Sequence, residues 1–202
     1  MTRFTEEDRE RIRSQLVDAG RELFAQYGFA ETRIRDVTDA VGIGTSTFYQ
    51  FFDSKESLYV EVLRIERARL HDRIDDAVSA AETPRKEVET MLRVMLREVR
   101  SNPHTSRLFV EGELRLIAEH LSDAERQSLT DGEQTGDLPY AESWAAMDAF
   151  RYDDPAAVAD LFRSLVFVTR AKDADIVPAE DYEETEDRLI ETIVDGLFVE
   201  SR

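Results

Sequence analysis

Hydrophobic residues recur every three to four positions along most of the chain, which is the spacing of helices that bury one face. The first stretch of this kind is followed by Gly28, a common helix-ending residue, so we expect a helix over about residues 6–27. Its apolar positions are Ile12, Leu16, Ala19, Leu23 and Tyr27.

Two short helices are expected next. Thr32 is a candidate N-terminal cap for the first, which stops at Gly42, and Thr45 can cap the second, which ends near Phe52. The apolar positions of the first are Ile34, Val37 and Val41. Because the intervening turn contains glycine, the pattern predicts two helices joined by a tight turn.

Longer helices follow. Asp53 with Glu56 is a possible capping pair for a helix that runs toward Ala81. Pro84, directly after Thr83, suits the first turn of the next helix, which carries an apolar stripe. That stripe consists of Val88, Met91, Met95 and Val99.

The chain is broken again at Asn102–Pro103, before a helix expected to run through Leu121, and Ser122 with Glu125 can cap another. The polar, acidic residues 130–139 are expected to form a loop.

Two helices are expected to close the chain, over about residues 155–170 and 180–199. Neither strand alternation nor a repeat of fixed period is visible anywhere in the sequence. The predicted fold class is therefore all-α.

The uncharged segment from Thr45 to Phe52 is the main chemical clue. In a helix-turn-helix the second helix enters the major groove of DNA and the first crosses the backbone, and hydroxyl, amide and aromatic groups can contact base edges without net charge. The groups of these types are Thr45, Ser46, Thr47, Tyr49 and Gln50. Phe48 and Phe52 are expected to pack inward. The alternative is an ordinary helical corner in a bundle.

The net charge is −18, from 44 acidic and 26 basic residues, and all but three of the basic residues are arginines. Such a composition resembles that of proteins from salt-loving organisms, since the Debye length falls to ~3 Å at about 1 M salt. An ordinary acidic protein is the alternative. Taken alone, acidity argues against nucleic-acid binding.

The charge is uneven along the chain. Residues 1–73 hold 12 basic and 14 acidic side chains, whereas residues 74–202 hold 14 and 30. Different charge indicates different roles. We therefore expect a functional boundary between a helix-turn-helix domain over residues 1–53 and a second domain over residues 54–202, linked by the long helix 54–81.

Two stretches carry a family resemblance. They are LFAQYGFAETRIRDV and, after the turn, TFYQFFDSKESL. Over about residues 10–65 they make the chain resemble the N-terminal DNA-binding domain of the TetR (tetracycline repressor) family. In that family a three-helix unit binds DNA, and the remaining helices form a variable ligand-binding and dimerisation domain.

The resemblance implies that Tyr49 contacts a phosphate or a base edge and that Lys55 contacts a phosphate, with Thr32 and Thr47 supporting the same docking. The family often has a basic residue early in the recognition helix, where this chain has Thr45–Ser46. We therefore expect weaker phosphate attraction. The candidate DNA-binding residues are Thr32, Arg33, Thr45, Ser46, Thr47, Tyr49, Gln50 and Lys55.

The family layout also implies a pocket for a small-molecule effector among the helices after the DNA-binding domain. Large or adaptable apolar side chains suit such a cavity, and a few polar groups would orient the effector. The candidates are Met91, Met95, Phe109, Glu113, Leu116, Trp144, Met147, Arg163 and Phe167. The alternative is that these residues are ordinary core or surface positions.

The last two helices are expected to form a four-helix bundle with a second copy of the chain, giving a homodimer. The apolar faces are Val158, Leu161, Phe162 and Leu165 in one helix, and Leu189, Ile190, Ile193 and Leu197 in the other. The alternative is that both faces fill the chain's own core.

Catalysis and membrane insertion have little support. His71, His104 and His120 lie far apart without a metal-site pattern, and cysteine is absent. The longest apolar run, Leu165–Val168, is far shorter than the ~18 residues of a spanning helix, and a secretion signal is lacking. We expect a cytoplasmic protein without metal or cofactor.

These observations together predict a ligand-responsive dimeric transcription regulator. It would repress by binding a palindromic double-stranded DNA operator and would be released by a small-molecule effector. The alternatives are an architectural DNA-binding protein without effector and an all-α carrier or enzyme.

Overall fold

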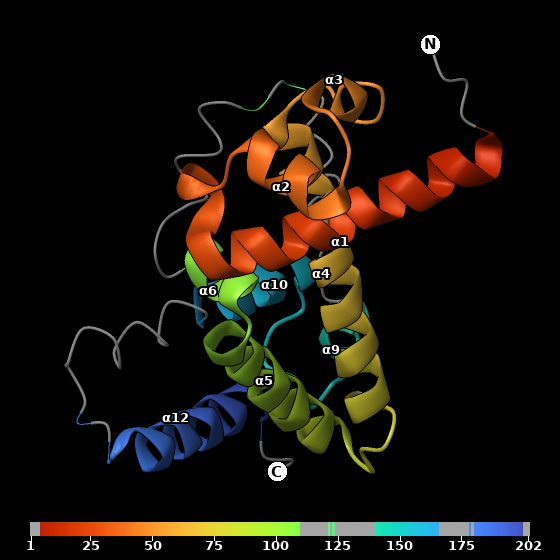
Figure 1. The fold of residues 1–202 in the computed structure, drawn as a ribbon. Helices are drawn as coiled ribbons and strands as arrows, with labels where there is room; N and C mark the ends of the chain where they lie inside the picture. Colours follow the sequence, from red (N-terminus) through yellow and green to blue (C-terminus); the bar gives the residue numbers. More distant parts are fainter. Residues whose placement is uncertain are drawn as a thin grey trace. The chain divides into compact units, whose positions relative to one another are not determined.

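The structure is a computed structural model that describes residues 5–109, 121, 123, 140–165, 178 and 180–199. Its regular secondary structure is α-helix, with one isolated antiparallel bridge between Phe150 and Phe198, so the predicted fold class is confirmed. The chain forms two compact units (Figure 1). Unit one contains the helices up to Ala68, and unit two begins at Arg69.

Unit one opens with α1 (Glu6–Glu31), which begins at a capping box formed by Thr5 and Asp8. Gly28 interrupts this helix with φ 81° and ψ 170°, a conformation that side chains with a Cβ rarely adopt. The predicted helix end at Gly28 therefore coincides with a break in the backbone, and one more helical turn follows, to Glu31.

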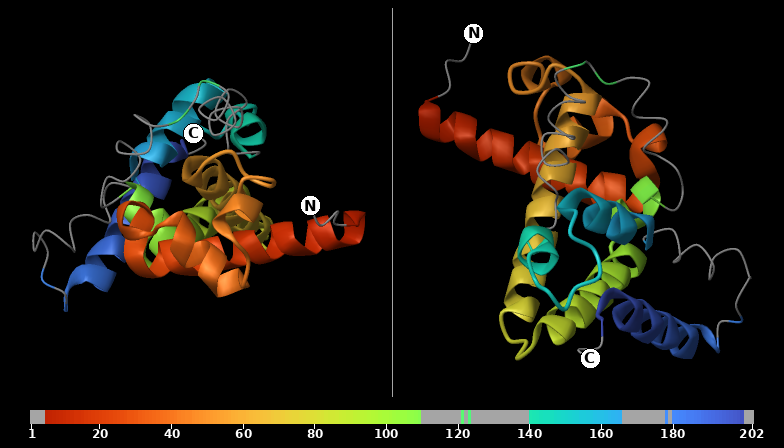
Figure 2. Two further views of the ribbon diagram at one scale, coloured as in Figure 1. Left: turned by 45° about the horizontal axis from the view of Figure 1, so that its top comes forward. Right: turned by 180° about the vertical axis from the view of Figure 1, so that it is seen from behind.

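The helix-turn-helix follows directly. α2 (Ile34–Val41) stops at Gly42, whose φ of 77° places it in the left-handed region, and α3 (Thr45–Phe48) begins after Gly44. Both helices lie on one side of α1 in Figures 1 and 2. The predicted pair of short helices joined by a glycine-containing turn is therefore confirmed, but the second helix ends at Phe48 and not near Phe52.

The predicted caps of α2 and α3 are both wrong. The hydroxyl of Thr32 donates to the carbonyl of Gly28 at 2.7 Å, so this buried side chain closes α1 and does not cap α2. Gly44, not Thr45, precedes α3 as its cap residue.

At the start of α4 (Lys55–Val78), the caps are two serines rather than the predicted Asp53 and Glu56. Ser54 and Ser57 each accept, through the hydroxyl oxygen, a hydrogen bond from the backbone N–H of the other, at 3.0 and 3.1 Å. These bonds satisfy donors that the first helical turn leaves open.

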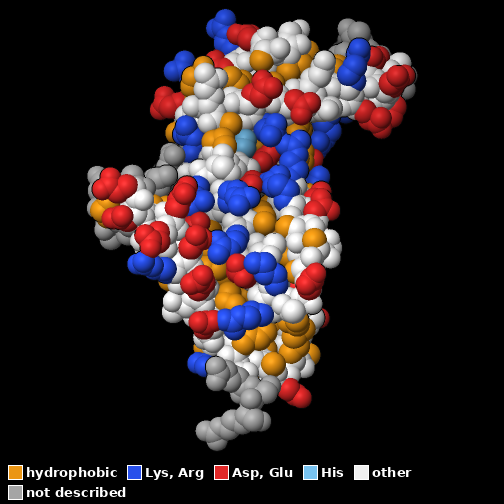
Figure 3. Space-filling view, turned by 90° about the horizontal axis from the view of Figure 1, so that it is seen from below, with side chains coloured by type: hydrophobic (Ala, Val, Ile, Leu, Met, Phe, Trp, Pro, Cys, Tyr) orange, Lys and Arg blue, Asp and Glu red, His pale blue; other side chains and the backbone are white. Residues whose placement is uncertain are grey.

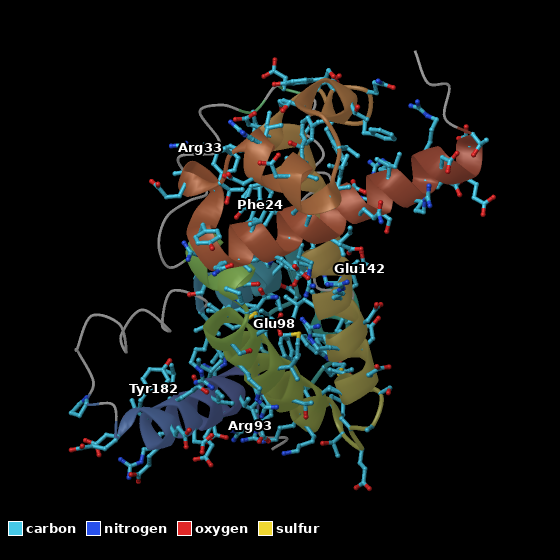
Figure 4. The ribbon with its side chains drawn as sticks, viewed as in Figure 1. Phe24, Arg33, Arg93, Glu98, Glu142 and Tyr182 are labelled. Atoms are coloured by element: carbon cyan, nitrogen blue, oxygen red, sulfur yellow. The ribbon has the colours of Figure 1, made fainter. Side chains whose placement is uncertain are left out.

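The core of unit one joins α1 to α4. The rings of Phe24 and Tyr59 meet edge to face with centroids 4.7 Å apart, and Phe29 lies 5.2 Å from Tyr59. Figure 4 labels Phe24 within this core. The two helices approach closely at Gly20, where an added Cβ would lie 2.9 Å from Cδ2 of the buried Leu58.

Unit two contains the end of α4 and five further described helices. They are α5 (Pro84–Ser101), α6 (Pro103–Phe109), α9 (Ala141–Ala145), α10 (Pro155–Leu165) and α12 (Tyr182–Leu197). Thr83 caps α5 by accepting from the N–H of Lys86 at 3.2 Å, with Pro84 in the first turn as predicted. The helix break at Asn102 is also as predicted.

The region between α6 and α10 differs from its prediction or lies outside the described residues. α9 was not anticipated, because its five residues are too few to show a helical repeat. The expected end of a helix at Leu121, the helix capped by Ser122 and Glu125, and the loop at 130–139 fall wholly or largely outside the described residues.

Trp144 is the centre of the apolar core of unit two and is fully buried. Its ring contacts Tyr140, Phe150 and Phe162, and its indole N–H donates to Glu87 at 3.0 Å. The core comprises Val78, Val88, Met91, Leu92, Leu96, Ala141, Trp144, Phe150, Val158, Phe162, Ile190, Val194 and Leu197.

This core corrects the predicted dimer faces. Val158 and Phe162 of α10, with Ile190 and Leu197 of α12, are at most 2% exposed and pack inside their own chain. A second chain therefore cannot cover these four side chains, and the alternative of an intrachain core is correct for them. The half-buried members of the predicted faces are Leu161, Leu165, Leu189 and Ile193.

Ion pairs border the contact between α5 and α12. Arg85 pairs with Asp195, Arg93 with Asp187, and Arg100 with Glu186. Figure 4 labels Arg93 on α5, and Figure 3 shows basic and acidic side chains interspersed over one face of the molecule. Each exposed pair contributes little by itself, about 0–1 kcal/mol, so the apolar core carries most of the stability.

Replacing Gly20 tests the close approach of α1 to α4. Gly20→Val should lower the stability of unit one by about 1–3 kcal/mol, because Leu58 cannot move without disturbing its core. Gly196→Val, in α12, is the control, since a Cβ there has no neighbour within 4 Å. Thermal melting followed by circular dichroism measures both, and equal midpoints would contradict the close packing.

Candidate nucleic-acid interface

The recognition segment, residues 45–52, consists of α3 and the turn that follows it. Phe48 is fully buried, whereas the adjacent Tyr49 is 54% exposed. The rings of Phe48 and Phe52 lie 5.8 Å apart on the inner side, and both phenylalanines are buried as expected. Burial of these two rings fixes which side of the segment faces solvent.

The outward side carries uncharged polar groups. Thr45, Ser46, Tyr49 and Gln50 are exposed, and Thr47 is half-buried. Hydroxyl and amide groups of this kind can donate to or accept from base edges, and none of them carries a formal charge. The structure therefore places the predicted recognition residues together on one short segment.

Lys55 lies at the other edge of this region, and its contacts are internal. Its ammonium donates to the carbonyls of Phe29 at 2.7 Å and Thr32 at 2.9 Å, and it lies 4.1 Å from the centroid of the Phe29 ring. A cation is favourable beside the last carbonyls of a helix. Lys55 therefore joins the start of α4 to the end of α1.

Several predicted residues share a hollow of about 340 Å³ on unit one. Arg33, which is exposed, and Tyr49 line it together with the first turn of α4 (Figure 4 labels Arg33). The lining residues are Ala30, Thr32, Arg33, Ile34, Tyr49, Asp53, Ser54, Lys55 and Glu56. The hollow thus brings four predicted positions together, although Thr32 is buried in its wall.

Two arginines of α1 were not identified from the sequence. Arg9 donates to the carbonyl of Gln50 at 3.2 Å and lies 5.2 Å from the centroid of the Phe51 ring. Arg13 lies 4.8 Å from the centroid of the Phe52 ring. The available signal was their spacing of four residues, which places both on one side of a helix.

The predicted effector residues are only partly within the described structure. Met91 and Trp144 are fully buried in the core of unit two, and Met95 and Met147 pack against that core. The side chains of Phe109 and Arg163 lie outside the described residues. So do Glu113, Leu116 and Phe167.

Within the described residues, groups of three or more acidic, histidine or cysteine side chains that could hold a metal ion are absent. Over the same part of the chain, every helix is too short or too polar to cross a membrane.

The sequence matches a known family over residues 16–62, the model described as "Bacterial regulatory proteins, tetR family". The HTH-type transcriptional repressor KstR2 of Rhodococcus jostii is 46% identical over 52 residues, which are 26% of each chain. KstR of Mycolicibacterium smegmatis is 27% identical over 143 residues, or 66% of this chain and 70% of that protein.

Most of these alignments cover only part of each protein. The chain spans between 26% and 46% of the length of most of the curated relatives that it matches. The fold is shared more widely. A TetR-family transcriptional regulator from Pectobacterium atrosepticum superposes with a TM-score of 0.68 at 19% identity, covering 98% of this chain and all of that one.

Because Phe48 is buried and Tyr49 is exposed, replacing each by alanine should change the stability of the fold by very different amounts. Phe48→Ala should cost about 3–5 kcal/mol of stability, because it empties a buried aromatic site. Tyr49→Ala should change stability by less than about 0.5 kcal/mol, since surface substitutions seldom do more. Urea unfolding followed by circular dichroism compares the two, and the reverse order would show that the faces are misassigned.

The internal contacts of Lys55 predict a stability role. Lys55→Met should lower stability by about 1–3 kcal/mol, since two carbonyls lose a charged donor. Arg35→Met is the control, because Arg35 is exposed and pairs with Asp39 at 3.5 Å. Equal unfolding midpoints for Lys55→Met and the wild type would mean that these internal contacts do not stabilise the fold.

Proposed function

We propose that the chain belongs to the TetR family of bacterial regulatory proteins, whose model its residues 16–62 match, and that it is a ligand-responsive dimeric repressor of transcription. The observation that carries the proposal is the recognition segment, which exposes Tyr49 and Gln50 and buries Phe48. A helix-turn-helix that presents hydrogen-bonding groups in this way suits the major groove.

The contacts to DNA divide by chemistry. Thr45, Ser46, Tyr49 and Gln50 are the proposed contacts to base edges, because they are exposed and uncharged. Arg33 is the proposed phosphate contact, because it is exposed beside the hollow that Tyr49 lines.

The remaining predicted DNA-binding positions are proposed to act indirectly. Thr32 and Lys55 hold the elements that carry the DNA contacts in place, since both are hydrogen-bonded to the last turn of α1. Thr47 is half-buried and supports the same side of the segment.

A second copy of the chain is needed for a palindromic site. Dimeric helix-turn-helix proteins contact half-sites about 34 Å apart, one turn of the double helix. The proposed interface uses the half-buried Leu161, Leu165, Leu189 and Ile193 of α10 and α12, which the core leaves partly accessible.

The effector is proposed to bind within unit two, next to Met91, Met95, Trp144 and Met147. Methionine side chains adapt their shape to an apolar ligand, and the two on the edge of the core are already half-buried. Binding would favour a dimer whose recognition segments no longer match successive major grooves. Because operators lie in the bacterial cytoplasm, we place the protein there, and we assign no reaction to it.

A gel-shift assay with the DNA upstream of the protein's own gene tests the proposal. The wild type should retard this fragment, Tyr49→Ala should not, and one member of a metabolite panel should release the complex. Binding without release by any metabolite would favour an architectural role. Failure to bind either this fragment or any duplex selected from a random-sequence pool would overturn the proposal.

Salt dependence should be unusual. Each phosphate contact adds about −0.9 to the slope of log affinity against log salt on B-DNA. Between residues 31 and 55 the chain has three basic and four acidic side chains, and Lys55 and Arg35 already have protein partners. At high salt, screening would also weaken repulsion between phosphates and the acidic unit two.

We therefore expect a shallow or even positive slope for the wild type, consistent with a salt-adapted protein. Titration of a fluorescent operator from low to molar KCl measures it, with circular dichroism confirming the fold at each point. A steep negative slope would refute salt adaptation and leave acidity as a matter of solubility.

A further inference from the structure

The C-terminal end of the recognition segment is held from outside the helix-turn-helix. α3 has four residues, and the turn after it is closed by hydrogen bonds from Gln50 and Phe51 to Thr47 and Phe48, at 3.0 and 2.9 Å. So short a helix is unstable alone, and carbonyls at its end need partners. Contacts from other elements must therefore set where Tyr49 and Gln50 point.

Arg9 supplies one such contact. Its guanidinium donates to the carbonyl of Gln50 at 3.2 Å and stands 5.2 Å from the centre of the neighbouring Phe51 ring. A cation at the C-terminal end of a helical turn is favourable, and so is one over an aromatic face. Arg9 therefore contacts the main chain of a residue whose side chain is exposed to solvent.

Arg13, one helical turn further along α1, supplies the second contact. It lies 4.8 Å from the centre of the Phe52 ring and pairs with Glu61 of α4 at 3.3 Å. A hydrogen bond from Arg64, at 2.9 Å, and the charges of Arg13 and Arg64 hold the pKa of Glu61 below its usual value. Glu61 is therefore ionised at neutral pH and can hold Arg13 over the ring.

We propose that Arg9 and Arg13 are positioning residues for sequence discrimination: they fix the recognition segment against α1 so that Tyr49 and Gln50 meet base edges in a defined orientation. Each guanidinium group has an acceptor and a ring within the protein, so the role we assign to it is exerted through the segment. The inference rests on the proposed DNA-binding function and adds residues outside the helix-turn-helix to it.

Methionine substitutions separate the two roles. Arg9→Met and Arg13→Met keep an unbranched, largely apolar side chain but remove the charge and the donors. Arg11→Met is the matched control. Arg11 lies on the same stretch of α1, is 65% exposed and pairs with Asp8 at 2.7 Å, so its removal changes the net charge equally.

The probe is a duplex that the wild type selects from a random-sequence pool, together with single-base variants of it. For Arg9→Met and Arg13→Met, the preference for the selected duplex over its variants should fall about tenfold, the order of one lost base contact. The salt slope should stay that of the wild type. Arg11→Met should change neither quantity.

Two further variants test whether loss of discrimination results from unfolding. Arg9→Lys and Arg13→Lys keep the charge but lose the planar group that stacks on a ring and forms a fork of donors. They should also lose discrimination, with unchanged circular dichroism melting. A variant that melts earlier is compared with the wild type at a temperature where both are folded.

Other results would overturn the inference. A slope reduced by about one unit with discrimination intact would make the arginine a phosphate contact. Discrimination equal to that of the wild type in all four variants would mean that these contacts do not position the segment. If the wild type itself selects no duplex, the proposed function fails, an outcome distinct from both.

Discussion

The recognition segment depends on the burial of Phe48. Helix formation is cooperative, and four residues cannot stabilise a helix in water without help from the rest of the fold. Because Phe48 and Phe52 are buried, the exposed side of the segment is determined by which rings the core accepts. Everything that this surface can do chemically follows from that constraint, since Thr45, Ser46, Tyr49 and Gln50 are the residues left outside.

The constraint also reconciles the proposed DNA binding with a net charge of −18. Base edges offer hydrogen-bond donors and acceptors that neutral side chains can satisfy, so a recognition surface needs geometry more than charge. Many arginines in this chain instead neutralise the protein's own carboxylates, as at Arg93 and Asp187 or Arg21 and Glu66. These arginines thus reduce repulsion among the protein's own carboxylates.

Much of unit one could be predicted because local rules and the tertiary fold agree there. Gly42 stops α2 where the sequence suggested, and the alternation of Phe48 and Tyr49 gave the correct inward and outward sides. The caps failed because several hydroxyl and carboxylate groups lay within reach of each helix start. Local sequence does not reveal that the hydroxyl of Thr32 closes the preceding helix.

Long-range contacts set the remaining limits. The apolar faces of α10 and α12 show a helical repeat whether their cover is the same chain or another one, so periodicity could not decide between core and dimer interface. Likewise, nothing local pairs Arg9 with Gln50, 41 residues away. The effector candidates were the least determined, since a methionine lining a cavity and one filling a core have the same sequence signature.

Helix α4 is where the two compact units meet in sequence. Its first part supplies Leu58 and Tyr59 to the core of unit one, and Glu66 pairs with Arg21 at 2.5 Å. Beyond Ala68 the same helix supplies Val78 to the core of unit two. Packed cores resist small displacements. A ligand that favoured a different packing of the core of unit two would therefore act on α4, whose first part is packed into the core of unit one. The effect of such a ligand on the recognition segment would then depend on the contacts that hold the first part of α4. These are the hydrogen bonds from Lys55 to the end of α1 and the ion pair between Glu61 and Arg13.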